Sequence, residues 1–152
     1  MLLMQPLISV PEGSRVGFLS QLERTAAKRY REWAEEDPDL RDWLIECADR
    51  EDQIADRAAR LVPVKPGDEA IVAEALAKAS ALYASAFEGH CLRDRIILQA
   101  HAERQGSLAW VGFASQTDDE AVKAEFLVLA GLEIASADQI DSELGVRTSQ
   151  PV

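Results

Sequence analysis

Four glutamates lie on the apolar faces of predicted helices, where carboxylates are uncommon. Each has apolar residues about one turn before and after it, and the four are Glu23, Glu51, Glu103 and Glu133. An isolated buried carboxylate is costly, or it takes up a proton. Four carboxylates directed into one core therefore need a counter-charge, and two divalent cations would balance them. Oxygen ligands of this type suit iron, manganese and other hard cations.

The two halves of the chain repeat the order of these residues. An aromatic residue, Tyr30 or Trp110, follows the first glutamate of each half by seven positions. An acidic break comes next, at 36–39 and at 117–120. The second glutamate stands 28 residues after the first in one half and 30 after it in the other. This order predicts an internal duplication of a helical hairpin.

The breaks lie midway between the glutamates of each half. Asp37 is the midpoint in the first half and Asp118 in the second. Each glutamate is thus about 14 residues, or roughly 21 Å of helix, from its own turn. In an antiparallel hairpin the two carboxylates then reach the same height. If the hairpins pack together, all four converge in the middle of one bundle.

The elements that must position the glutamates are helices. Aromatic residues make up only 6% of the chain, and no run of Val, Ile and Thr alternates with polar residues, so strands are not expected. We predict an N-terminal extension over 1–13, an all-α bundle over 14–144 and a flexible C-terminal tail over 145–152. The predicted helices span 14–36, 38–61, 68–87, 91–115 and 119–143. Asp37 caps the second of them, with Pro38 in its first turn. The sequence leaves open whether 68–87 is separate from the helix that follows it.

Composition excludes several classes of protein. A net charge of −11 argues against nucleic acid as a partner. The amino terminus lacks the basic start of a signal peptide, and no stretch reaches the length of a transmembrane helix. Cys47 and Cys91 have no metal-ligand spacing and indicate reduced thiols. We expect a cytoplasmic protein without a membrane partner. We also expect a homodimer or higher homo-oligomer, since the crossover segment at 71–87 has apolar positions to cover.

At these residues the chain resembles the ferritin-like superfamily, and among its members the rubrerythrin-type and bacterioferritin-type di-iron bundles. The resemblance covers roughly residues 14–144 and includes a long crossover in the middle. It implies an antiparallel four-helix bundle in which the four glutamates hold two metal ions, iron or manganese. In such families the centre reduces oxygen or peroxide, or oxidises iron for storage. The chain has no Cys-x-x-Cys pair, so a redox role would require an external reductant.

The chain departs from the family where histidines are expected. Ile54 and Ser136 stand three residues after the second glutamate of each half. His101 is about 200° around the helix from Glu103, and His90 lies near a break, so neither replaces a lost ligand. The remaining ligands are carboxylates and water. Four further side chains lie on the same faces as the glutamates: Tyr30, Gln99, Trp110 and Ser136. Gln99 and Ser136 would contribute oxygens, and the aromatic residues would pack or quench oxidising intermediates.

The residues leave three hypotheses open. The first is a metal-handling or redox protein with an all-carboxylate di-metal site. The second is a ferritin-like scaffold without metal, which serves as an oligomerisation or protein-binding module. In that case the glutamates would pair with Arg24, Arg104 or Arg50, or lie at a seam between subunits. The third is an unrelated helical bundle with no site. The pattern assigns no catalytic residue, so it does not establish whether the protein is an enzyme.

Overall fold

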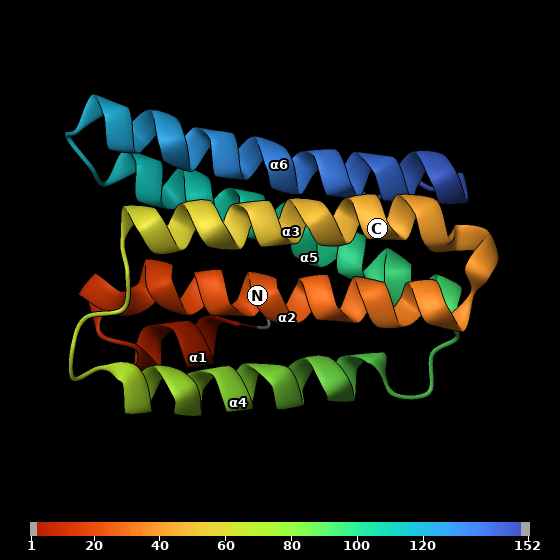
Figure 1. The fold of residues 1–152 in the computed structure, drawn as a ribbon, viewed down its shortest axis with the longest axis horizontal. Helices are drawn as coiled ribbons and strands as arrows, with labels where there is room; N and C mark the ends of the chain where they lie inside the picture. The colour runs from red at the N-terminus through yellow and green to blue at the C-terminus, as the bar shows by residue number, and fades with distance from the viewer. Residues whose placement is uncertain (1–2, 150–152) are drawn as a thin grey trace. The chain divides into compact units, whose positions relative to one another are not determined.

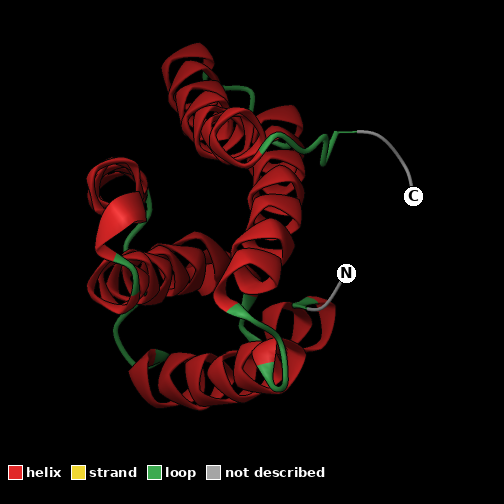
Figure 2. Cartoon of the chain, turned by 90° about the vertical axis from the view of Figure 1, so that its right-hand side faces the viewer, coloured by secondary structure: helices red, strands yellow, loops and turns green. Residues whose placement is uncertain are grey.

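The computed structural model describes residues 3–149, which fold entirely into helices and connecting loops, without a strand (Figure 2). The all-α prediction is confirmed. The ends of the predicted extension and tail, residues 1–2 and 150–152, lie outside the described residues. The helices are α1 (Met4–Ser9), α2 (Arg15–Glu36), α3 (Arg41–Leu61), α4 (Glu69–Phe87), α5 (Leu92–Ser115) and α6 (Glu120–Leu144), with 3₁₀ turns η1 (Glu12–Ser14) and η2 (Pro38–Leu40) (Figure 1). The chain divides into two compact units, Met1–Glu88 and Gly89–Val152.

The first unit is built on a hairpin of α2 and α3, which lie side by side (Figure 1). Asp37 ends α2 and accepts a hydrogen bond from the Asp39 backbone N–H at 3.0 Å, as its capping position predicts. Pro38 starts the short turn η2 before α3 begins at Arg41, because its fixed φ suits a first turn. Small and branched side chains pack between the two helices, among them the fully buried Ala27 and Ile54. This close packing brings the two helix faces within reach of each other's side chains.

The loop before α4 is fastened to the start of α2. Ser14 donates from Oγ to Asp68 Oδ2 at 2.6 Å and accepts from the Lys65 backbone N–H at 2.9 Å. Gly17 allows this close approach, since a Cβ there would lie 2.6 Å from the Val64 backbone nitrogen. Ser14 therefore holds the crossover rather than capping α2 through its hydroxyl. Gly89, with φ +77°, follows α4, so 68–87 is a separate helix.

α4 packs one narrow face inward and leaves much of its surface exposed. Val72, Ala75 and Ala79, spaced by three and four residues, are buried. Phe87 meets Trp33 of α2 edge to face, with ring centroids 5.5 Å apart. Of the described helices, α4 alone is long and apolar enough to cross a membrane, so the expectation that no stretch reaches that length is wrong. Core helices of soluble proteins also meet these criteria of length and composition.

The second unit is a hairpin of α5 and α6. Asp119 caps α6 by accepting hydrogen bonds from the backbone N–H groups of Ala121 and Val122. Gly145, with φ +66°, ends α6 in the left-handed conformation that glycine adopts readily. Beyond it the chain folds back, and Thr148 Oγ1 donates to Asp141 Oδ1 at 2.7 Å. This contact orders the first residues of the segment for which a flexible tail was predicted.

Asp141 stabilises the second unit in a pH-dependent way. Burial raises the pKa of its carboxyl, but hydrogen bonds from Thr148 and Arg104 outweigh burial and hold that pKa below its ordinary value of 3.8. A depressed folded-state pKa contributes stability that is present above the unfolded pKa and is lost as the pH falls through the folded pKa. We predict that Asp141→Asn lowers the free energy of unfolding by about 1–2 kcal/mol at neutral pH.

Urea unfolding at pH 7 and at successive steps below pH 4 measures this contribution. The gap between the wild type and Asp141→Asn should narrow as the pH falls. Glu143→Gln, an exposed carboxylate on the same helix, is the matched control and should change little. A gap that stays constant across the acid range would contradict the assigned role of Asp141.

Candidate metal centre

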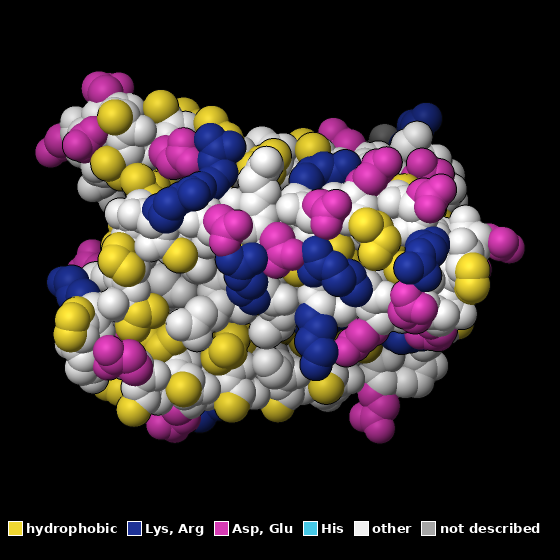
Figure 3. Space-filling model, in the orientation of Figure 1, with side chains coloured by type: hydrophobic (Ala, Val, Ile, Leu, Met, Phe, Trp, Pro, Cys, Tyr) yellow, Lys and Arg dark blue, Asp and Glu magenta, His cyan; other side chains and the backbone are white. Residues whose placement is uncertain are grey.

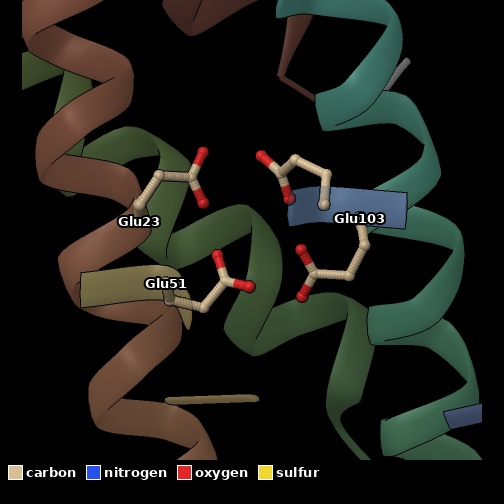
Figure 4. A group of neighbouring side chains, drawn as sticks. Glu23, Glu51 and Glu103 are labelled. Atoms are coloured by element: carbon tan, nitrogen blue, oxygen red, sulfur yellow. The ribbon is translucent and has the colours of Figure 1, made fainter. Parts of the chain in front are cut away.

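The first pair of glutamates is formed by the hairpin of the first unit. Glu23 projects from α2 and Glu51 from α3, and Figure 4 shows their carboxylates pointing into the same space. One oxygen of Glu23 lies within 4.8 Å of one oxygen of Glu51. The Glu51 side chain is completely buried, whereas Glu23 is partly exposed. The expectation that a hairpin brings its two glutamates to one height is confirmed for this unit.

The second pair has the same form in the second unit. Glu103 of α5 and Glu133 of α6 also offer oxygens within 4.8 Å of each other, and their exposures are 2% and 1%. Gln99 donates from Nε2 to Glu103 Oε1 at 2.8 Å. Trp110 donates from Nε1 to Glu133 Oε1 at 2.9 Å, so it supports a glutamate of the opposite helix. Gln99 was expected to contribute an oxygen, but here its amide nitrogen holds the carboxylate in place.

Gly106 makes room for the second pair. A Cβ at this position would lie 2.7 Å from Glu133 Oε1 and 3.0 Å from its Cδ, both closer than ordinary contact. The glycine stands in the interior of α5, where it costs up to about 1 kcal/mol relative to alanine. It follows Glu103 by three residues, one turn along the same face. Its spacing from Glu103 predicts that Gly106 lies on the inward face of this helix, but spacing alone does not indicate which side chain occupies the space beside it.

The arginines that follow the first glutamate of each pair turn to the outer faces of the hairpins. Arg24 contacts Asp52 at 2.7 Å and also contacts Asp56. Arg104 contacts Asp138 at 2.9 Å and Asp141 at 2.8 Å. Asp56 and Asp138 each stand five residues after the second glutamate of their unit, so the ion pairs match between the two units. Figure 3 shows acidic and basic side chains alternating over α2 and α3.

These ion pairs shift the pKa values of their members. The hydrogen bond to Asp52 is the largest cause that raises the pKa of Arg24. For Asp52, burial raises the pKa, but Arg24 and Arg31 together lower it below its ordinary value. These pKa shifts favour the charged forms of the arginine and the aspartate in each ion pair on the outer face. Arg24 and Arg104 thus form their ion pairs with these outer aspartates rather than with the buried glutamates.

The remaining predicted residues are placed as follows. Tyr30 is completely buried and meets Trp33 edge to face with ring centroids 5.7 Å apart. Ser136 is completely buried, and so is Ile54 at the corresponding position of the first unit. His101 is half-buried and His90 is exposed, and neither belongs to the group of candidate metal ligands. The ligand atoms of each pair are carboxylate oxygens.

This arrangement suits a divalent cation. Two carboxylates held this close in a buried setting repel each other, and the repulsion is relieved by a shared proton or by a cation. Each carboxylate offers oxygen ligands, which suit magnesium, manganese or iron better than softer metals. Gln99 and Trp110 are neutral donors, so they fix the direction of the carboxylates without cancelling charge.

The role of Gly106 can be tested without metal. For dilute protein, we predict that Gly112→Ala, in open space on the same helix, raises the free energy of unfolding by about 0.5–1 kcal/mol, because alanine favours the helix. Gly106→Ala should gain less or lose stability, because its methyl group displaces the Glu133 carboxylate from its bond with Trp110. Urea unfolding followed by tryptophan fluorescence measures both effects. Equal gains in the two variants would contradict the proposed contact.

No family model, curated protein or solved structure matches this chain. The candidate centre is therefore characterised by its own geometry, two pairs of carboxylates held in matched helical hairpins.

Proposed function

We propose that the two glutamate pairs form one site of four carboxylates that binds two divalent cations, iron or manganese. The two hairpins would then be the halves of an antiparallel four-helix bundle of the ferritin-like type. The observation that carries this proposal is the burial of paired carboxylates at corresponding positions of two hairpins. The protein would handle such metals or use them in redox chemistry.

Charge balance supports two cations. The four ionised side chains carry four negative charges, and two divalent ions neutralise them. The close approach of the two carboxylates within each pair, aided in the second pair by the space beside Gly106, makes both available to a shared ion.

The ligand set predicts which ions bind. Oxygen ligands alone favour hard cations, and the replacement of imidazole by Ile54 and Ser136 lowers the affinity for softer ones. Once bound, iron would supply one-electron redox chemistry at this site. The protein's own residues orient the carboxylates through Gln99 and Trp110 and exclude water with buried apolar side chains such as Ile54. Reduction of the site would depend on an external reductant.

A metal-free scaffold is the second candidate, and the buried Ile54 in place of a ligand favours it. In that case the glutamates would share protons, and the outer surfaces would carry the function as an assembly or binding module. Two of the arginines considered as partners for the glutamates, Arg24 and Arg104, engage outer aspartates instead. These ion pairs argue against a metal-free scaffold in which Arg24 and Arg104 neutralise the buried glutamates.

Metal stoichiometry separates the two candidates. We predict about two metal ions per chain by elemental analysis of protein purified without chelator, and by anaerobic titration with ferrous iron. Glu51→Gln and Glu133→Gln keep the size of the side chain but remove its charge, and each should abolish binding of at least one ion. The control is Glu74→Gln, because Glu74 is an exposed carboxylate that pairs with Lys78 on α4.

The outcomes are distinct. Two ions lost on substitution of the buried glutamates, and retained in Glu74→Gln, would support the di-metal site and justify assays with oxygen and peroxide. Absence of bound iron or manganese, together with buried-glutamate variants as stable as the wild type, would instead favour the metal-free scaffold. Gly106→Ala should bind metal at least about tenfold more weakly than Gly112→Ala if Glu133 is a ligand.

A further inference from the structure

Two segments of the second hairpin, one on each helix, are almost without charge. Residues 105–117 contain no charged side chain, whereas the window at the same distance from the glutamate in the first hairpin, 25–37, contains seven. On the partner helices, 126–137 contains only Glu133, whereas 44–55 contains five charged residues. In a chain that is 28% charged, this contrast between matched segments needs a physical reason.

The contrast is sharpest on the outer face of the hairpin. In the first unit, Arg31 pairs with Asp49 at 3.2 Å and with Asp52 at 2.6 Å. Corresponding positions in the second unit are those at the same distance from its glutamates. For these three residues they hold Val111, Gly131 and Ile134. The ion pair of Lys28 with Glu32 is replaced in the same way, by Leu108 and Gly112, and Glu46 is replaced by Val128. We name these replacements the outer apolar face: Leu108, Val111, Gly112, Val128, Gly131 and Ile134.

Much of this face is open to solvent. Leu108 is 63% exposed, and Val111 and Val128 are also exposed. A Cβ added at Gly112 or at Gly131 would meet nothing within 4 Å. Glycine inside a helix is unfavourable, and here no neighbour in the described chain requires it. Open glycines beside exposed apolar residues permit another helix to approach closely.

We infer that the outer apolar face is the interface of a homodimer, in which the same face of a second copy covers it. The distribution of charge favours a second copy of the chain as the partner at this face. The chain carries a net charge of −11, so two copies repel each other unless they meet through a surface free of charge. The outer apolar face is such a surface, and its best match is an equally uncharged one. A two-fold axis supplies that match, because it brings the same patch of both copies together.

The same observations disfavour other uses of the face. A lipid surface is usually bound by a helix with basic residues beside its apolar face, and 105–117 and 126–137 contain none. The interface also differs from the one expected from the sequence, which placed the contact on the crossover helix α4. The inference does not depend on metal, since it involves only the surface away from the glutamates.

Returning charge to the face tests the inference. Leu108→Lys combined with Val128→Glu gives the second hairpin the side chains of the first at those positions. Sedimentation velocity of the full chain over a range of concentrations should show a dimer for the wild type. The double variant should raise the dimer dissociation constant by at least about tenfold. Its helix content by circular dichroism should be unchanged, because both positions are exposed.

Two further variants complete the test. Ile71→Lys, at an exposed apolar position of α4, should leave the dimer intact. Gly131→Leu fills the open space, so it should weaken the dimer, while the dilute protein keeps its helix content and melts no lower than the wild type. A wild type that is monomeric at all concentrations would overturn the inference. So would a dimer that is lost in Ile71→Lys but unaffected by Leu108→Lys with Val128→Glu and by Gly131→Leu.

Discussion

The repulsion between closely held carboxylates is the constraint around which each hairpin is arranged. Glu51, Glu103 and Glu133 are buried among apolar side chains, where an ionised group is unfavourable unless its charge is balanced. The helices keep this arrangement because apolar residues above and below each glutamate pack between the helices. Trp110 and Gln99 then fix the direction of two of the carboxylates. These features are the basis of the proposal that the glutamates bind a cation.

The outer faces show how the two hairpins differ once this shared constraint is met. Both have an arginine beside the first glutamate and an aspartate five residues after the second. The first hairpin adds a series of ion pairs around Arg31, which suits a surface in water. The second has apolar residues and glycine at the same positions, which suits a surface covered by protein. The inner faces of the two hairpins thus carry the same type of side chain, whereas their outer faces differ.

Much of the fold could be predicted from the sequence because its signals are local. Helical periodicity and the cap at Asp37 depend on neighbouring residues, so α2 to α6 lie close to their predicted bounds. The pairing of glutamates within each hairpin followed from counting residues to the turn. The bond from Ser14 to Asp68, the contact of Trp110 with Glu133 and the space beside Gly106 depend on residues far apart in the sequence. Periodicity carries no information about such contacts. The short helix α1 lay within the predicted extension, where no pattern distinguished it.

Thermal unfolding with and without metal tests the central claim most directly. If the buried carboxylates are held for a cation, manganese should raise the melting temperature of the wild type above its value in chelator. The double variant Glu51→Gln with Glu133→Gln should melt higher than the wild type in chelator and should not respond to manganese. A wild type whose melting temperature is the same in manganese, ferrous iron and chelator, and a double variant that is less stable than it, would contradict the account.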